Sequence, residues 1–519
     1  ESVEIAKLSL WLNTAESKRK LVSLNNNIKC GNSLIDDIEV AGDRAFNWGK
    51  AFPDVFEKGG FDVIIGNPPY VFSRDNISIK LKNYYSQSYV SAEYQVNTYL
   101  LFVEQTIKLI RNKANYGLII PNAWLMVGSA KGLRKLILEN CSVNEIVNLT
   151  GYSFDGINVE TIIILASKIK PIDENNEIKI LLSAGKEFRY SHKRKQVDFK
   201  NSEGFEFKVF SNEESLAITK KLIKDSKNLD DLVIIKAGLQ AYEKNKGIPK
   251  QTIEDVKNRP YDYTFKFDEN THKYLEGKDV GRYTINWGGQ YLQYGKQLAA
   301  PRTFDLFDGE KIILREITGN FPNCLISSYS SKLYLYNRSN IAIVQRQELN
   351  ISLKYIVAIL NSKLMSYFFL KNTAKSVRKM FPKIILNDLR KFPIKDVNLD
   401  KQEPFIKSAE VNLRLNKEMK LLSFKFKSLL ESDLSLEKTS KKLETWFNLD
   451  WGEFENEIRK QKIILKGEQK EDWFDRFNRL KLNAQTLKNQ INQTDKEIDE
   501  MVYELYGLTK EEIEIVENS

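Results

Sequence analysis

The sequence has 519 residues, of which 42% are hydrophobic and 29% charged, and its formal net charge is +10. This length predicts roughly two to four domains with buried cores, and the composition excludes an intrinsically disordered chain. No segment reaches the roughly 18 to 20 uncharged apolar residues of a membrane span, and the first residues lack a signal-peptide pattern, so we expect a cytoplasmic protein. The basic excess allows a nucleic-acid partner but does not establish one.

Few residues are available for metal or histidine chemistry. Cys30, Cys141 and Cys324 lie far apart without metal-ligand spacing, and His192 and His272 are the only histidines. We therefore expect neither a disulfide framework nor a metal site, and histidine-based acid–base catalysis has little material. The carboxylates show no convincing nuclease cluster.

Residues 1–170 alternate between helical and extended patterns. A helical pattern begins at Val3 without a capping residue before it, so we expect the chain to begin inside a domain. Alternation of this kind predicts an α/β fold with a Rossmann-like parallel sheet covered by helices on both faces. The strands are expected at 28–30, 61–66, 117–121, 143–149 and 159–167, and the helices at 3–12, 94–112 and 129–140.

The most informative motif directly follows the apolar run Phe61–Gly66, which is typical of a strand buried on both faces. The next residues are Asn67, Pro68, Pro69 and Tyr70. Because proline has no N–H group and a fixed φ angle, the strand must stop there in a rigid, extended turn. Ligands of open parallel sheets bind beyond the carboxyl ends of the strands, so this turn lies where a ligand is expected.

The side chains of this turn suit chemistry on the exocyclic amine of adenine. That amine is a poor nucleophile because its lone pair is delocalised into the ring, so a methylating site should offer acceptors and no strong acid. The Asn67 side-chain carbonyl and the Pro68 backbone carbonyl can accept its two N–H bonds, and Tyr70 can stack on a base rotated out of the duplex. A plain surface turn is the alternative, but the surrounding strands and helix favour the catalytic interpretation.

Two further regions follow. Residues 171–400 contain short strand patterns, aromatic residues and glycine-containing turns interleaved with basic residues, which predict a second domain of the α+β type. Residues 401–519 predict a helical C-terminal region whose helices pack on one another or on the other domains. The apolar residues at helical spacing include Leu480, Leu487, Ile491, Ile498, Val502 and Leu505.

Residues 28–167 resemble the catalytic domain of the gamma-class adenine-N6 DNA methyltransferases. The likeness is to members fused to a Taq-type specificity domain, as in type IIG restriction-modification enzymes and the BREX methyltransferase PglX. The segment Gly66–Tyr70 matches the (D/N/S)PP(Y/F) motif of that family. The resemblance implies that Asn67, Pro68, Pro69 and Tyr70 are the catalytic residues and that S-adenosylmethionine is the methyl donor.

The resemblance also implies contacts outside this motif. Asn32, Ser33 and Pro69 are the residues expected to bind the cofactor, although Asn32 stands where the family usually has an Asp and lacks its charge. Phe154 resembles the aromatic residue that stacks on the second face of the flipped base, with core packing as the alternative role. The family's glycine-rich loop and acidic ribose ligand would precede Glu1. We therefore expect a partial methyltransferase domain, inactive alone, that a missing N-terminal segment or a second chain completes.

Residues from about 230 to 400 resemble the Taq-type C-terminal specificity domain. The likeness rests on the segments 277–283, 311–319 and 360–364. Such a domain needs Arg and Lys side chains for phosphates and guanine edges, and a solvated surface charge is the alternative for each of them. The candidates for contact with double-stranded DNA are Lys278, Arg282, Arg302, Arg315, Arg378 and Lys379.

These observations favour a site-specific DNA methyltransferase that acts on the N6 atom of a flipped adenine, within a restriction-modification or phage-defence system. Two alternatives stay open at this point. The chain could be a DNA-binding specificity fragment without activity of its own, or a part of a bifunctional type IIG restriction endonuclease.

Overall fold

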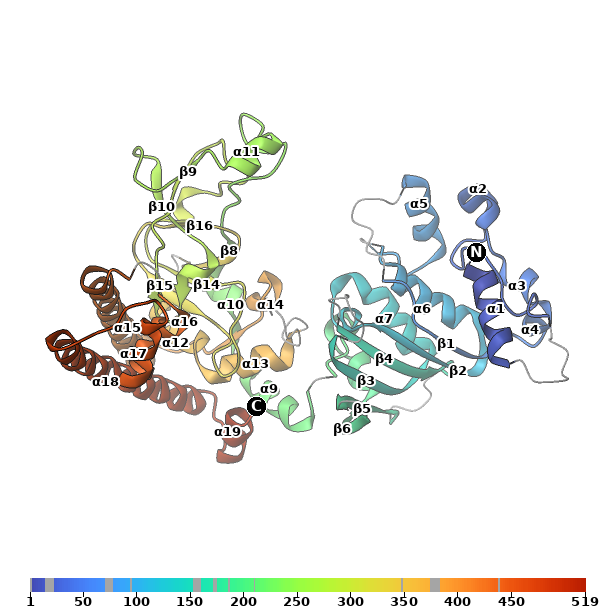
Figure 1. Cartoon of the computed structure of the whole chain (residues 1–519). Coiled ribbons are helices and arrows are strands. Elements are labelled where there is room, and N and C mark those ends of the chain that lie inside the picture. Colours follow the sequence, from blue (N-terminus) through green and yellow to red (C-terminus); the bar gives the residue numbers. More distant parts are fainter. Residues whose placement is uncertain are drawn as a thin grey trace. The chain divides into compact units, whose positions relative to one another are not determined.

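The computed structural model divides the chain into two compact units, Glu1–Glu213 and Glu214–Ser519, here the first and second units (Figure 1). Each is described by itself. The residues that the structure describes are 2–14, 23–70, 78–93, 96–152, 160–170, 175–184, 187–209, 211–346, 349–373, 383–436 and 439–519.

The first unit is built on a mixed sheet with the strand order β1-β2-β4-β3-β5-β6. β1 runs parallel to β2, and β3 runs parallel to β5. β4 runs antiparallel to both of its neighbours, and β6 runs antiparallel to β5. The strands are β1 (Phe61–Gly66), β2 (Ile110–Pro121), β3 (Ser142–Tyr152), β4 (Glu160–Ser167), β5 (Glu177–Ala184) and β6 (Glu187–Lys195).

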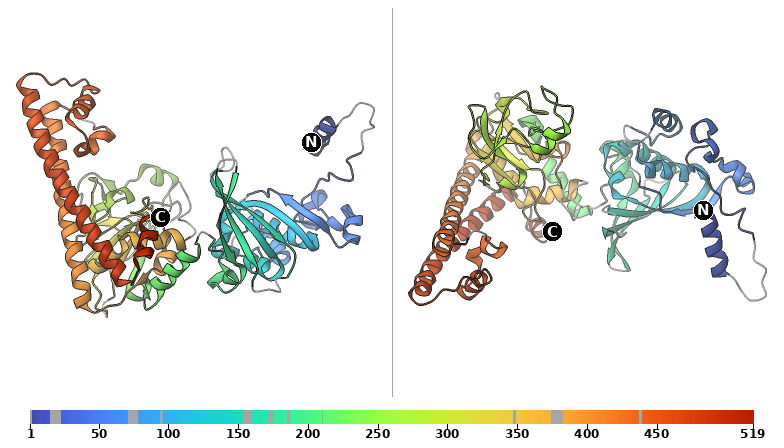
Figure 2. Two further views of the ribbon diagram at one scale, coloured as in Figure 1. Left: turned by 90° about the horizontal axis from the view of Figure 1, so that it is seen from below. Right: turned by 45° about the horizontal axis from the view of Figure 1, so that its top comes forward.

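Two helices cover one face of this sheet. α6 (Thr98–Leu109) packs on β2, α7 (Lys131–Asn140) packs on β3, and the two helices contact each other (Figures 1 and 2). Their buried side chains, among them Val103 and Ile137, form the core of the unit. The other helices are α1 (Ser2–Thr14), α2 (Ile38–Ala41), α3 (Trp48–Ala51), α4 (Pro53–Glu57), α5 (Ile79–Ser88) and α8 (Gln196–Lys200).

The expectation of a purely parallel sheet is wrong at β4. β3 ends at Tyr152 and β4 begins at Glu160. A parallel crossover needs about a dozen residues or more, so this short connection joins antiparallel neighbours. The sheet also continues past residue 170, where the sequence predicts the end of the domain, because β5 and β6 pair onto β3.

The expectation that the strand at 61–66 is buried on both faces is also wrong. Among the described residues β1 pairs only with β2, so it forms an edge of the sheet. Ile64 packs against the core, whereas Val63 and Ile65 are 58% and 81% exposed. Leu165 of β4 is also exposed and lies across Gly117 from Ile65, so an apolar strip of this sheet face is uncovered.

The described residues of the second unit form two four-stranded sheets, with the strand orders β15-β14-β17-β8 and β16-β10-β13-β9, and two two-stranded sheets, β11-β12 and β18-β7. The first of them is antiparallel throughout, and β10 and β16 of the second run parallel. The strands of the unit are β7 (Lys227–Asn228), β8 (Val233–Ala237), β9 (Asp262–Tyr263), β10 (Thr271–Leu275), β11 (Val280–Gly281), β12 (Thr284–Ile285), β13 (Tyr291–Gln293), β14 (Lys311–Arg315), β15 (Ser327–Ser330), β16 (Leu335–Tyr336), β17 (Asn340–Gln345) and β18 (Pro393–Ile394).

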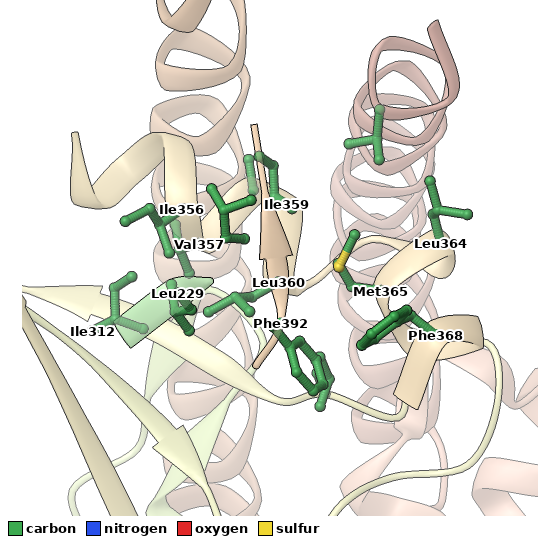
Figure 3. Close-up of a cluster of buried hydrophobic side chains, with 14 of the residues drawn as sticks. Leu229, Ile312, Ile356, Val357, Ile359, Leu360, Leu364, Met365, Phe368 and Phe392 are labelled. Carbon is green, nitrogen blue, oxygen red and sulfur yellow. The ribbon is translucent and has the colours of Figure 1, made fainter. Parts of the chain in front are cut away.

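Helices pack on the antiparallel sheet and form the largest core of the second unit. Apolar residues of α12 and α13 lie against Ile312 of β14 and against Leu229 and Phe392 (Figure 3). The helices are α9 (Glu213–Ile223), α10 (Leu229–Leu232), α11 (Ile253–Asn258), α12 (Leu353–Leu360), α13 (Lys363–Asn372), α14 (Leu386–Arg390), α15 (Leu399–Leu434), α16 (Lys441–Glu444), α17 (Trp451–Arg459), α18 (Glu468–Leu505) and α19 (Lys510–Glu517).

The two longest helices, α15 and α18, lie antiparallel as a helical hairpin (Figure 2). Near its tip, Phe426 of α15 stacks on Trp446 at a centroid distance of 3.9 Å, within an aromatic core that includes Phe477 of α18. The apolar spacing in the sequence predicts α18, and its Leu480 and Ile498 are buried.

No single helix of the described ranges has the length and hydropathy to cross a membrane. The pair α12 and α13 passes that test together, but it is bent by 64° and its apolar residues belong to the core.

Candidate functional site

The turn from Asn67 to Tyr70 lies at the end of β1, beside the end of β2. Gly66, the last residue of β1, is in register with Leu118 of β2. Asn67 and Pro69 are exposed, Tyr70 is half-buried and Pro68 is buried. The turn is therefore anchored by one proline and is not packed shut, so the Asn67 side chain is open to solvent.

Contacts from two elements hold this turn. Thr98, the first residue of α6, donates from Oγ1 to the Pro69 carbonyl oxygen at 2.7 Å. The Tyr70 hydroxyl donates to Asn67 Oδ1 at 2.7 Å and lies 3.1 Å from the Ile119 carbonyl oxygen on β2. Because the two prolines restrict φ as well, the Asn67 side chain projects from a backbone with little freedom.

Tyr70 packs against Tyr99 through its ring and orients the Asn67 amide through its hydroxyl. Its ring meets the ring of Tyr99 edge to face at a centroid distance of 6.3 Å, and burial raises the pKa of Tyr70. The phenol therefore stays protonated and donates its hydrogen bond. Since an amide oxygen has two lone pairs, Asn67 Oδ1 can accept a second donor.

Sequence reasoning missed Thr98 and the Ile119 carbonyl. Thr98 lies 29 residues from Pro69, and Ile119 lies 49 residues from Tyr70. Only the packing of α6 and β2 brings them to the turn, and no local pattern marks either residue.

The segment with Asn32 and Ser33 forms a tight turn of its own. Asn32 Oδ1 accepts from the Leu34 backbone N–H at 3.2 Å, and the Ser33 carbonyl accepts from Trp48 Nε1 at 3.0 Å. Ser33 lines a cavity of about 350 Å³ together with Asp36 and Trp48, and no lining residue of that cavity belongs to the turn at 67–70.

Three predicted site residues lie outside the described ranges: Phe154, Arg378 and Lys379. Of the other predicted DNA contacts, Arg302 is exposed, and its Nε lies 3.4 Å from the Gly238 carbonyl oxygen. Within the described ranges, the structure therefore does not bring any of these four residues together with another predicted site residue.

The structure brings Lys278, Arg282 and Arg315 together. They line a cavity of about 460 Å³ between β11, β12, the end of β14 and the helical hairpin. Lys278 forms an ion pair of 2.9 Å with Glu276, and Arg315 forms no ion pair with any residue that the structure describes.

Arg282 differs from the expected free basic side chain. Its guanidinium donates to both carboxylate oxygens of Asp495 on α18, at 2.9 and 3.2 Å, and to the Asn361 carbonyl oxygen at 3.0 Å. This geometry ties the turn between β11 and β12 to the helical hairpin and pairs the charge of Arg282, while its contact with DNA stays a prediction.

Comparison with family models now adds to this geometry. Residues 1–154 match the model described as Eco57I restriction-modification methylase, and residues 272–394 match the TaqI-like C-terminal specificity domain. These matched segments, 1–154 and 272–394, are called the methylase region and the specificity domain below. Residues 398–502, most of the helical hairpin, match a domain of unknown function. The open turn at 67–70 lies in the methylase region. The 460 Å³ cavity lies between the specificity domain and the hairpin.

The curated relatives are type II restriction-modification methyltransferases. The putative type II restriction enzyme and methyltransferase RM.MjaORFECS2P of Methanocaldococcus jannaschii is 26% identical over 68% of this chain and 28% of its own length. RM.Eco57I of Escherichia coli is 33% identical over 25% of this chain and 13% of its own length. The type II methyltransferase M.HincII of Haemophilus influenzae is 25% identical over 66% of this chain and 76% of its own length. The chain thus spans less than a third of the first two relatives.

Among solved structures, the type IIL restriction-modification enzyme MmeI, determined in complex with DNA, is similar to this chain. The match has a TM-score of 0.53 at 11% identity and covers 89% of this chain and 56% of MmeI. It shows that the mixed α/β fold is shared.

Proposed function

We propose that this protein is the base-modifying and DNA-reading part of a site-specific adenine-N6 DNA methyltransferase of a restriction-modification or phage-defence system. The observation that carries the proposal is the solvent-open Asn67 amide on a rigid double-proline turn at the end of a strand. The methylase and specificity regions supply the context, because they combine base modification and DNA reading in one chain. The proposal includes a cytoplasmic location, where the DNA substrate lies.

In this proposal the target adenine leaves the duplex and its amine enters the turn. Asn67 Oδ1 and the Pro68 carbonyl accept the two N–H bonds, which holds the nitrogen as it becomes tetrahedral and stabilises the positive charge that develops there. S-adenosylmethionine, when bound, supplies an electrophilic methyl group. Tyr70 stacks on the base and, through its hydroxyl, orients the amide of Asn67.

The cofactor fits the described residues only in part. Ser33 lines a cavity large enough for one end of a nucleoside, but neither Asn32 nor Pro69 lines that cavity. We therefore assign Asn32, Ser33 and Pro69 at most to one end of the cofactor. The remaining contacts come, in this proposal, from another segment of the protein or from a second chain.

The sheet of the first unit supports this need for a completing segment. Within the described part of the first unit, β1 has an unpaired edge, and Val63, Ile65 and Leu165 expose an apolar strip on one sheet face. Apolar sheet faces are normally covered in α/β proteins. We infer that a further α/β segment covers this strip, and that the chain by itself is inactive.

The test is the variant Asn67→Ala in the completed enzyme. Without the amide acceptor, we expect transfer of labelled methyl groups to duplex DNA to fall by at least about a hundredfold, while DNA affinity stays near that of the wild type. Asn26→Ala, at an exposed turn position of the same unit, is the matched control and should retain full activity. Full transfer by Asn67→Ala would contradict the proposal.

A further inference from the structure

The cavity that joins the specificity domain to the helical hairpin has a strongly basic, amide-rich wall. Its four basic side chains face a single lining carboxylate, Asp495. Asparagine amides and the apolar side chains of Val280, Ile326 and Ile491 complete the wall. The basic and amide side chains of the lining are Lys278, Arg282, Arg315, Lys488, Asn286, Asn323 and Asn416.

Two of the four basic charges are uncompensated. Asp495 neutralises Arg282, and Glu276 neutralises Lys278. Arg315, at the end of β14, and Lys488, on α18, form no ion pair within the part of the chain that the structure describes. Both belong to the wall of the same cavity, so the cavity concentrates positive charge.

The surroundings increase this positive potential. Lys420 of α15 donates to the Ile285 carbonyl oxygen at 2.7 Å, next to the lining residue Asn286. Burial lowers the pKa of Lys420, the neighbouring Lys332 and Lys273 lower it further, and Asp279 acts in the opposite direction. Like charges that gather in this way favour a bound anion.

The donors of the cavity match the chemistry of a phosphodiester. The planar guanidinium of Arg315 and the mobile ammonium of Lys488 suit phosphate oxygens, and amide N–H groups add neutral donors. The Nε atom of Arg282 is buried without a hydrogen-bond partner, although its other nitrogens are paired. A volume of about 460 Å³ exceeds a bare phosphate ion, and the apolar residues can contact the attached sugar.

We propose that this cavity binds a backbone phosphate of DNA, with Arg315 from the specificity domain and Lys488 from the helical hairpin as its charged donors. The hairpin, which matches a domain of unknown function, then completes the DNA-binding surface of the second unit. This inference rests on the proposed function and adds a defined subsite to it. Arg282 and Asp495 hold the two walls together and are positioning residues.

The test is the salt dependence of DNA binding by the full chain and by the double variant Arg315→Gln/Lys488→Gln. Fluorescence anisotropy of a labelled duplex gives the affinity at several salt concentrations. Loss of one phosphate contact reduces the magnitude of the slope of log K against log salt by about 0.9, so we expect a slope shallower by about 0.9 and an affinity about tenfold weaker at low salt. Far-UV circular dichroism verifies folding. Lys488→Gln alone, at an exposed position, serves if the double variant does not fold.

The control is the double variant Lys427→Gln/Arg459→Gln, which removes the same charge from the helical region outside the cavity. It should bind DNA like the wild type, and an equal loss in this control would overturn the inference.

A cavity variant with wild-type affinity and slope overturns the inference alone. A wild-type chain that does not bind DNA overturns the proposed function as well. A titration with inorganic phosphate is the last measurement. If the wild type binds phosphate, the cavity variant does not, and both bind DNA with equal affinity, the cavity is assigned to a free phosphate ion and the DNA assignment is overturned.

Discussion

At the scale of single residues, the proposed methyl transfer depends on how one amide oxygen is held. Asn67 Oδ1 is oriented by the Tyr70 hydroxyl, and the backbone beneath it is tied to α6 by Thr98. Preorganised acceptors are effective in catalysis because they need no rearrangement when charge develops. Tyr70 therefore has two separable contributions, its ring and its hydroxyl.

Substitutions of Tyr70 should separate these contributions. Tyr70→Phe keeps the ring and loses one ordinary hydrogen bond, worth about 1 kcal/mol, so kcat should fall by roughly three- to tenfold. Tyr70→Ala also loses base stacking, and we expect a further fall of at least about tenfold. Single-turnover methyl transfer by the completed enzyme measures both. Equal activity of the two variants would exclude a stacking role for the ring.

Some residue roles can be predicted from sequence, and others cannot. The turn at Asn67 is recognisable because the apolar run and the two prolines are adjacent in the chain. The partner of Arg282 is not, since Asp495 is 213 residues away and only the fold brings it near. An arginine that binds phosphate and one that anchors a helix look the same in a sequence.

At the scale of elements, α18 is docked through a buried carboxylate. Asp499 accepts from the Lys363 backbone N–H at the start of α13 at 2.8 Å. Burial raises its pKa from 3.8 to about 6, against the opposing effects of the Lys363 N–H, of Lys363 and of Arg282. The apolar spacing of α18 predicts the helix, but gives no sign that a charged residue lies beneath it.

The stability of the second unit should therefore depend on pH through Asp499. A carboxyl group with a higher pKa in the folded than in the unfolded state favours folding when protonated, so this contribution is lost as the pH rises from about 4 to about 6. Asp499→Asn should remove a pH-dependent change of roughly 2 kcal/mol in the free energy of unfolding, measured by urea denaturation between pH 4 and 7. Asp472→Asn, exposed on the same helix, is the control. Identical pH profiles for Asp499→Asn and the wild type would refute this role.

Strand direction marks the limit of sequence reasoning at this scale. The strand patterns at 143–149 and 159–167 correspond to β3 and β4. Their antiparallel pairing follows from the length of the connection, whereas an apolar period of two is the same in both directions. The exposure of β1 could not be predicted from the sequence either, because an apolar run does not show how many neighbouring strands pair with it.

At the scale of the whole molecule, the two units have separate cores. Among the described residues, the first unit has one core between its sheet and the helices α6 and α7 and a smaller one beside α5, and the second unit has three cores of its own. A unit with its own core is expected to fold alone.

Residues 214–519, expressed alone, should unfold in a cooperative transition and bind duplex DNA. The cavity with Arg315 and Lys488 lies wholly within them, so the salt dependence of binding should equal that of the full chain. Calorimetry and anisotropy titration provide the two measurements. A fragment that folds but has lost DNA affinity would assign the main DNA contacts to the first unit.

The free edge of β1 has a practical consequence for anyone who purifies this chain. Exposed β-branched residues on a strand that pairs on one side only, as β1 does among the described residues, form a template for strands of other molecules, and neither Val63 nor Ile65 offers a charge that would repel them. The protein should therefore aggregate as its concentration rises, through intermolecular sheet growth at this edge. A lysine in place of Ile65 would blunt that growth and make concentrated samples easier to keep in solution.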